Sequence, residues 1–167
     1  MKSLAPSALV LALLVAPAFA DEISPNCTGA EFRQLDFWVG DWDLSWQGQT
    51  GTNHIKKSFE ACVIEENFGG SPGQHLKGHS VSMYDARSKE WKQTWVDNEG
   101  SYIALSGGPQ ADGTFLLATQ PGPKGGRSRM VFENIKPDSF VWRWQSSTDG
   151  QTWTGQWVIN YTRRKPS

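Results

Sequence analysis

From Val39 onward, apolar and polar residues alternate with a period of two, and turn residues interrupt the alternation at short, regular intervals. Alternate side chains of an extended chain point to opposite faces, so this period predicts β-strands with one buried face. We expect strands over residues 39–48, 53–66, 76–84, 90–97, 101–107, 113–119, 127–135, 139–147 and 151–162. Short strands at this spacing indicate an all-β barrel or sandwich, and a short helix over 28–35 precedes them.

The first 20 residues have the pattern of a cleaved secretory signal peptide. Lys2 precedes an apolar run over residues 9–16, and Ala18-Phe19-Ala20 is a small-x-small cleavage site. The apolar run is shorter than the roughly 20 residues of a spanning helix, so we expect no transmembrane anchor. Residues 21–167 would then form one domain, exported to the periplasm of a Gram-negative host or secreted otherwise.

The charge of the chain excludes some classes of partner. Without Lys2, the mature chain carries 15 basic and 17 acidic side chains, a net charge of −2. It has no basic stripe and no polybasic cluster, which argues against nucleic acid and against an anionic membrane surface as partners. The oligomeric state is left open.

Cys27 and Cys62 are the only cysteines in the sequence. In an oxidising compartment a single disulfide is the natural interpretation, and two unpaired thiols are the alternative. The sequence lacks the Cys-x-x-Cys pair that would indicate a metal site. His75 and His79 are four residues apart, but on a strand this spacing separates the side chains by about 13 Å. We therefore predict no metal and no cofactor.

The chain contains nine tryptophans, far above ordinary usage. They fall in groups with even spacing: Trp38, Trp42 and Trp46; Trp91 and Trp95; Trp142 and Trp144; Trp153 and Trp157. Even spacing places the rings of each group on one face of an extended chain. They either pack the core or form a ligand-stacking surface, because binding pockets are also lined by aromatic side chains.

Polar residues interrupt two of the expected inner faces. Gln93 lies between Trp91 and Trp95, and a buried amide without partners costs about 1–3 kcal/mol. The neighbouring strand has a stripe of three polar residues on one face: Ser80, Ser82 and Tyr84. The stripe either forms a polar pocket wall, or faces solvent while Val81 and Met83 face the core.

Two charged positions are candidates for the interior. Arg129 shares a face with Val131, and an arginine inside a barrel pairs with a carboxylate or recognises an anionic ligand. Glu66 and Gln145 are its candidate partners, whereas for Arg127, on the same face beside the Gly125-Gly126 loop, a surface position is at least equally favoured. Glu66 has the parity of Cys62 and Ile64, which favours the interior for Glu66 and the exterior for Glu65.

Several motifs together resemble a family of bacterial exported domains of unknown function with an expected lipocalin-like (calycin) barrel. They are residues 35–43, Cys62-x-x-x-Glu66, Gly78-x-Ser80, residues 91–100 and the closing Tyr161-x-Arg163. The resemblance spans about 35–163 and implies fold and export, but no activity. In such barrels the Trp of a Gly-x-Trp motif closes one end against an arginine of the last strand, which implies structural roles for Trp42 and Arg163.

These features predict an up-and-down barrel of about eight to ten strands that binds a small amphipathic or aromatic molecule. The candidate ligand-binding residues are Ser80, Tyr84, Trp91, Gln93, Trp95, Arg129 and Trp142. The sequence has no nucleophile motif, so we expect a binding protein rather than an enzyme. The alternatives are a barrel enzyme of the isomerase or cyclase type that uses Glu66 or Tyr84, and a structural or interaction protein with a filled barrel.

Overall fold

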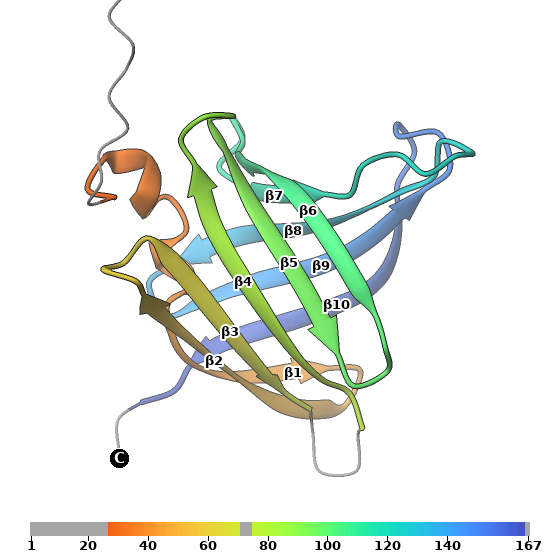
Figure 1. The fold of residues 1–167 in the computed structure, drawn as a ribbon. Coiled ribbons are helices and arrows are strands. Elements are labelled where there is room, and N and C mark those ends of the chain that lie inside the picture. The colour runs from red at the N-terminus through yellow and green to blue at the C-terminus, as the bar shows by residue number, and fades with distance from the viewer. Residues whose placement is uncertain (1–26, 71–74, 166–167) are drawn as a thin grey trace, which may run out of the picture.

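The computed structural model describes residues 27–70 and 75–165, which form a closed antiparallel barrel of ten strands (Figure 1). The predicted signal peptide lies outside the described residues. Each strand pairs with its neighbours in sequence, and β1 pairs with β10 to close the ring. This order confirms the predicted up-and-down all-β barrel. The strands are β1 Gly40–Trp46, β2 Gln49–Ser58, β3 Val63–Gly69, β4 Lys77–Asp85, β5 Glu90–Asp97, β6 Tyr102–Pro109, β7 Phe115–Ala118, β8 Arg127–Lys136, β9 Ser139–Ser147 and β10 Thr154–Arg163.

The range 53–66, expected as one strand, is divided between β2 and β3. The turn between them contains Phe59, Glu60 and Ala61, with φ of 48°, 58° and 67°. Left-handed conformations are uncommon outside glycine and asparagine, so no residue type indicated this turn in the sequence. Tertiary contacts hold it instead. Cys62 forms a disulfide with Cys27, which confirms the predicted pairing, and Arg33 Nη2 donates a 2.7 Å hydrogen bond to the carbonyl oxygen of Ala61.

Two short 3-10 helices, η1 Ala30–Arg33 and η2 Asp36–Trp38, take the place of the single expected helix. They lie against one end of the barrel, and the β5–β6 turn lies at the other end (Figure 1). Phe32, Leu35 and Trp38 are buried, so these helices close the end that they cover. Among the residues that the structure describes, no helix is long and apolar enough to cross a membrane.

Trp42 and Arg163 join the first and last strands at the closed end. They are paired across β1 and β10, and the Arg163 guanidinium carbon lies 4.2 Å from the centroid of the Trp42 ring. Arg163 Nη1 donates to the carbonyl oxygen of Val39 at 2.9 Å, and Arg163 Nε donates to that of Pro137 at 2.9 Å. Trp42 is fully buried and donates through Nε1 to the carbonyl oxygen of Trp38. The contact implied by the sequence resemblance is thus present and ties three chain segments together.

The interior follows the alternation read from the sequence, except near two register shifts, one in β8–β9 between Glu133 and Lys136 and one in β9–β10 between Gly155 and Trp157. Trp42, Leu44 and Trp46 of β1 are buried, while the residues between them are exposed. Trp153 and Trp157 were expected to share a face, and this expectation is wrong. Trp153 precedes β10, and the β9–β10 register shifts between Gly155 and Trp157, which breaks the parity.

Candidate functional site

A cavity of about 150 Å³ lies inside the barrel, and its lining reaches from Trp38 of η2 to Asp97 and Ile103 beside the β5–β6 turn. Seven aromatic side chains line it: Trp38, Phe68, Trp95, Trp142, Trp144, Trp157 and Tyr161. Aliphatic side chains fill the spaces between the rings: Leu76, Ile103, Leu105, Met130 and Ile159. The ends of β3 and β5 and the start of β6 form its rim, because the residues Phe68, Asp97 and Ile103 lie there. The alternative of a filled barrel, in which the tryptophans occupy the whole interior, would leave no such cavity.

The cavity rings stand at steep angles to one another. Trp142 and Trp157 meet at 86°, Phe68 and Trp157 at 79°, and Phe68 and Trp95 at 68°, with centroids 5.7–6.0 Å apart. Edge-to-face pairs of this kind are favourable beyond their buried area, so they hold each ring in a fixed orientation. Trp142 and Trp144 are nearly parallel at 10°, because they point inward from the same strand. The rings thus form walls on several sides of the cavity.

Glu66 is the polar side chain at the floor of the cavity. Its strand position places it inside the barrel, where it is only 6% exposed. Asn53 Nδ2 donates to Glu66 Oε1 at 2.7 Å, and Ser80 Oγ donates to Glu66 Oε2 at 2.6 Å. Asn53 Nδ2 also donates to the Tyr161 hydroxyl at 3.1 Å. Each carboxyl oxygen therefore has one protein donor and keeps lone pairs available to a bound molecule.

Burial dominates the protonation of this network. Loss of water around the carboxyl group raises the pKa of Glu66 from 4.5 to about 7, against the opposing effect of hydrogen bonds from Ser80 and Asn53. Burial and the neighbouring Glu66 charge raise the pKa of the Tyr161 hydroxyl well above its usual value, so Tyr161 stays protonated. Glu66 is therefore close to half-ionised near neutral pH.

Ser82 and Gln93 extend the polar layer behind the cavity. Both are buried and paired across β4 and β5, and Gln93 Nε2 donates to Ser82 Oγ at 2.9 Å. Gln93 Oε1 and Asn53 Oδ1 are buried without a hydrogen-bond partner among the described residues, as is the donor Trp38 Nε1. Such a group costs about 1–3 kcal/mol when it is left unpaired, and native proteins contain only a few of them.

Asp97 lies at the rim of the cavity, at the end of β5. Trp95 Nε1 donates to Asp97 Oδ2 at 2.9 Å, and the backbone N–H groups of Glu99 and Ser101 donate to Asp97 Oδ1. Burial alone would raise the pKa of Asp97, but these hydrogen bonds outweigh it and lower the pKa. Asp97 thus places a negative charge at the rim and fixes the orientation of the Trp95 ring.

Four of the predicted ligand-binding residues lie in or beside this cavity. Trp95 and Trp142 line it, Ser80 bonds the Glu66 floor, and Gln93 lies in the polar layer behind it. Ser80 and Ser82 point inward, whereas Val81 and Met83 are 41% and 44% exposed, which decides between the two alternatives for this strand.

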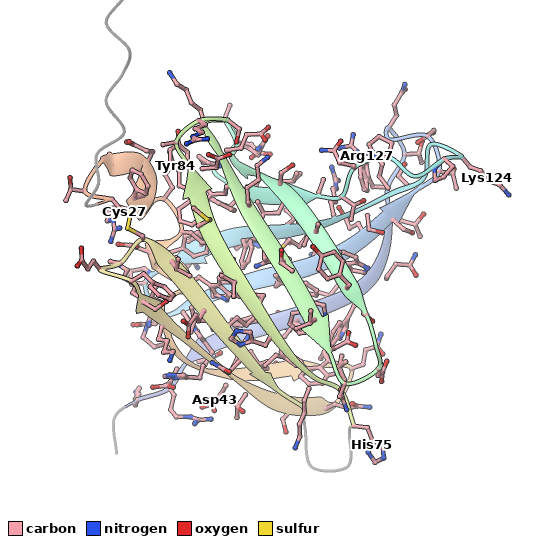
Figure 2. All side chains as sticks on the ribbon, in the orientation of Figure 1. Cys27, Asp43, His75, Tyr84, Lys124 and Arg127 are labelled. Carbon is pink, nitrogen blue, oxygen red and sulfur yellow. A yellow bond between two sulfur atoms is a disulfide. The ribbon has the colours of Figure 1, made fainter. Side chains whose placement is uncertain are left out.

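Tyr84 and Trp91 point inward at the opposite end of the barrel. Figure 2 shows Tyr84 near the end that η1 covers and His75 at the far end. The Tyr84 ring meets Phe32 of η1 edge-on at 5.2 Å, and Trp91 Nε1 donates to Gln34 Oε1 at 3.1 Å. Both side chains therefore pack the closed end and line a separate surface depression, not the aromatic cavity.

Arg129 lies on the outside of the barrel, so the expectation of an arginine in the interior is corrected. Met130 lines the cavity, so the inward parity of β8 is that of Met130 and Phe132, although Val131 is also only 8% exposed. Arg129 Nε donates to Gln145 Oε1 at 2.7 Å across the β8–β9 pair, and its guanidinium lies 4.0 Å from the centroid of the Trp153 ring. Gln145 is thus its partner, but on the outer face, and Glu66 is not.

Several cavity residues were not among the predicted site residues. Asp97 has the parity of Trp95 and Phe68 has that of Glu66, so their inward direction was readable from the alternation. What the alternation does not give is position along the barrel. Asn53 comes from the neighbouring strand β2, 13 residues from Glu66, whereas Tyr161 comes from the last strand and joins the network only because the barrel closes.

Fold and site together define a class: a ten-stranded up-and-down barrel with an aromatic cavity over a buried, titratable carboxyl group. Residues 28–163 match the model of a family described as a protein of unknown function (DUF1579). Because this match covers most of the chain, the protein belongs to the DUF1579 family. A search of the curated proteins gives no match.

Proposed function

We propose that this protein is an exported, lipocalin-like barrel that binds one small amphipathic or aromatic molecule in the cavity above Glu66. The observation that carries the proposal is the cavity itself, lined by seven aromatic side chains and floored by a polar network. Pockets that bind small molecules have this composition: mostly apolar walls with a few convergent polar groups.

The volume limits the size of the ligand. A dry cavity of about 150 Å³ in another protein accommodates benzene, so a molecule with about one ring or a short branched chain matches this cavity. Glu66 would fix its polar end and the tryptophans would contact its apolar part. Export is supported by the Cys27–Cys62 disulfide, which is typical of oxidising compartments.

The experiment is a calorimetric titration of the purified protein with a library of metabolites of one-ring size. Trp142→Ala, which opens the cavity wall, is expected to weaken binding of any hit about 10-fold or more, consistent with loss of a buried aromatic contact. Trp153→Ala and Arg129→Ala, both on the outer face, are the matched controls and retain native affinity. The proposal would be refuted if no member of the library bound, or if Trp142→Ala bound every hit as tightly as the two control variants do.

A second candidate function is a proton-transfer enzyme with Glu66 as its acid or base. It is favoured by one observation: burial raises the pKa of Glu66 to about 7, and an effective general base has a pKa near the working pH. Tyr84, the other residue considered for this role, lies at the opposite end of the barrel and takes no part in it.

Hydrogen–deuterium exchange into bound ligands tests this second function. A base at Glu66 would catalyse exchange of an acidic C–H of a bound ligand in D₂O, visible by NMR, and Glu66→Gln would abolish it. Tyr84→Phe serves as the control and retains exchange. A ligand that binds without exchange in the native protein leaves only the binding function.

A further inference from the structure

We infer that the ligand of the aromatic cavity is a small organic cation, a protonated amine or a quaternary ammonium group, held between Glu66 and Asp97 and against the tryptophan rings. The inference rests on the proposed binding function and gives the chemical class of its ligand.

The first argument is the charge of the cavity wall. Glu66 lies at the floor and Asp97 at the rim, and among the described residues that line the cavity there is no lysine, arginine or histidine. An anionic ligand would therefore enter a low-dielectric space with carboxyl groups at both ends and no counter-charge, which is costly. A cation would meet an opposite charge at either end.

The second argument is the arrangement of the rings. The face of an aromatic ring carries partial negative charge, and several rings around one space form the aromatic cages that bind quaternary ammonium groups. Trp157 stands nearly perpendicular to both Trp142 and Phe68, and Phe68 is steeply inclined to Trp95. These inclined rings suit a compact, rounded group, and the nearly parallel Trp142 and Trp144, which come from one strand, form a single wall of the same space.

The third argument concerns the donors around the two carboxyl groups. Asp97 accepts hydrogen bonds that keep it ionised, so the rim is negative. Glu66 accepts one hydrogen bond on each oxygen and has no cationic partner among the described residues. The groups packed against it are the amide of Asn53, the hydroxyl of Ser80 and the protonated hydroxyl of Tyr161. A bound cation would be the missing counter-charge of this buried acid.

This arrangement links cation binding to proton release. Glu66 has a pKa of about 7 in the free protein, and a cation beside it favours the ionised form. The affinity for a permanent cation should therefore rise about 10-fold between roughly pH 6 and pH 8, and binding near neutral pH should release a proton. Asp97 stays ionised throughout this range and does not contribute to the change.

The test uses three probes of one shape and different charge: choline, its neutral carbon isostere 3,3-dimethylbutan-1-ol, and the anion 3,3-dimethylbutanoate. Benzylamine and benzyl alcohol repeat the comparison with a ring. Each is titrated into the native protein by calorimetry, in two buffers of different ionisation enthalpy so that proton release is counted. We expect the cation of each set to bind at least about 10-fold more tightly than its neutral partner. We expect the anion to bind most weakly.

Two variants assign the preference to the cavity. Glu66→Gln keeps the shape of the side chain and is expected to remove most of the charge preference and the proton release. Its matched control is Glu65→Gln, because Glu65 faces outward and pairs with Lys56 at 3.1 Å. Asp97→Asn tests the rim charge independently should Glu66→Gln fail to fold, and it is expected to reduce the preference for the cation.

The outcomes separate this inference from the proposed function. Neutral probes that bind as well as the cations, or a cation preference that survives both carboxyl variants, would overturn the cation inference and leave a ligand-binding cavity. Failure of every probe to bind would also overturn it, whereas the metabolite library decides the proposed function on its own.

Discussion

Asn53 Nδ2 donates a hydrogen bond of 2.7 Å to Glu66 Oε1, and through this contact β2 and β3 share a buried polar group at the floor of an aromatic cavity. Ser80 and Tyr161 extend the network to β4 and β10. The network uses uncharged donors to hold a carboxyl group in the interior without a cationic partner. Its protonation state should therefore affect both stability and binding.

Glu66 should make the protein less stable as the pH rises from about 4.5 to about 7. The pKa is 4.5 in the unfolded chain and about 7 in the folded protein, so the folded state binds the proton more tightly. The stabilisation is complete below about pH 4.5 and is lost as the pH rises through about 7, a total of about 3 kcal/mol. Urea unfolding across this range, compared between the native protein and Glu66→Gln, isolates the effect. Equal pH profiles for the two proteins would contradict the assignment.

Gly78→Ala should disturb the cavity wall. A Cβ atom at Gly78 would overlap the six-membered ring of Trp95, which lies directly over this glycine. We expect a loss of about 1–3 kcal/mol of unfolding free energy from overpacking, together with weaker ligand binding. Chemical unfolding and the same ligand titration measure the two effects. Gly155→Ala is the matched control, because a Cβ atom there meets no atom within 4 Å.

Removing the disulfide should destabilise the barrel. Cys27 and Cys62 are separated by 35 residues, and the chain-entropy model gives about 4 kcal/mol for a loop of this length. The double variant Cys27→Ser/Cys62→Ser should unfold at correspondingly lower denaturant concentration. Reduction of the native protein should reproduce the shift, whereas an unchanged midpoint would show that the crosslink does not constrain the unfolded chain.

Replacing Arg163 by alanine should open the closed end of the barrel. The variant loses the contact with the Trp42 ring and hydrogen bonds to the carbonyl oxygens of Val39 and Pro137. We expect a loss of about 2–4 kcal/mol in unfolding free energy and a change in the near-ultraviolet signal of the buried Trp42. Arg164→Ala is the control, since its exposed pair with Asp43 should contribute less than about 1 kcal/mol. If both variants lost the same amount of unfolding free energy, Arg163 would not be a specific stabiliser of the closed end.

Much of the fold was predictable from local patterns. The period-two alternation predicted the inward direction of Glu66 and Trp95, and the Gly40-x-Trp42 motif with Arg163 indicated how the barrel closes. The turn after Ser58 was missed because Phe59 to Ala61 adopt left-handed conformations that their residue types disfavour. The alternation correctly showed that Arg129 shares a face with Val131, but it did not show which face points inward. In the structure the inward face of β8 is that of Met130, which lines the cavity, so Arg129 lies outside.

Within each regular strand, the sequence by itself determined which side chains share a face, because the two-residue repeat of an extended chain is a local property. It could not determine which residues share a site. Trp91 and Trp95 point to the same interior, yet four residues of strand separate them by about 13 Å, and they belong to opposite ends of the barrel. Only the closed barrel adds Tyr161 of the last strand to the network of Glu66, Asn53 and Ser80, and burial of the carboxyl group, not its identity, raises its pKa to about 7.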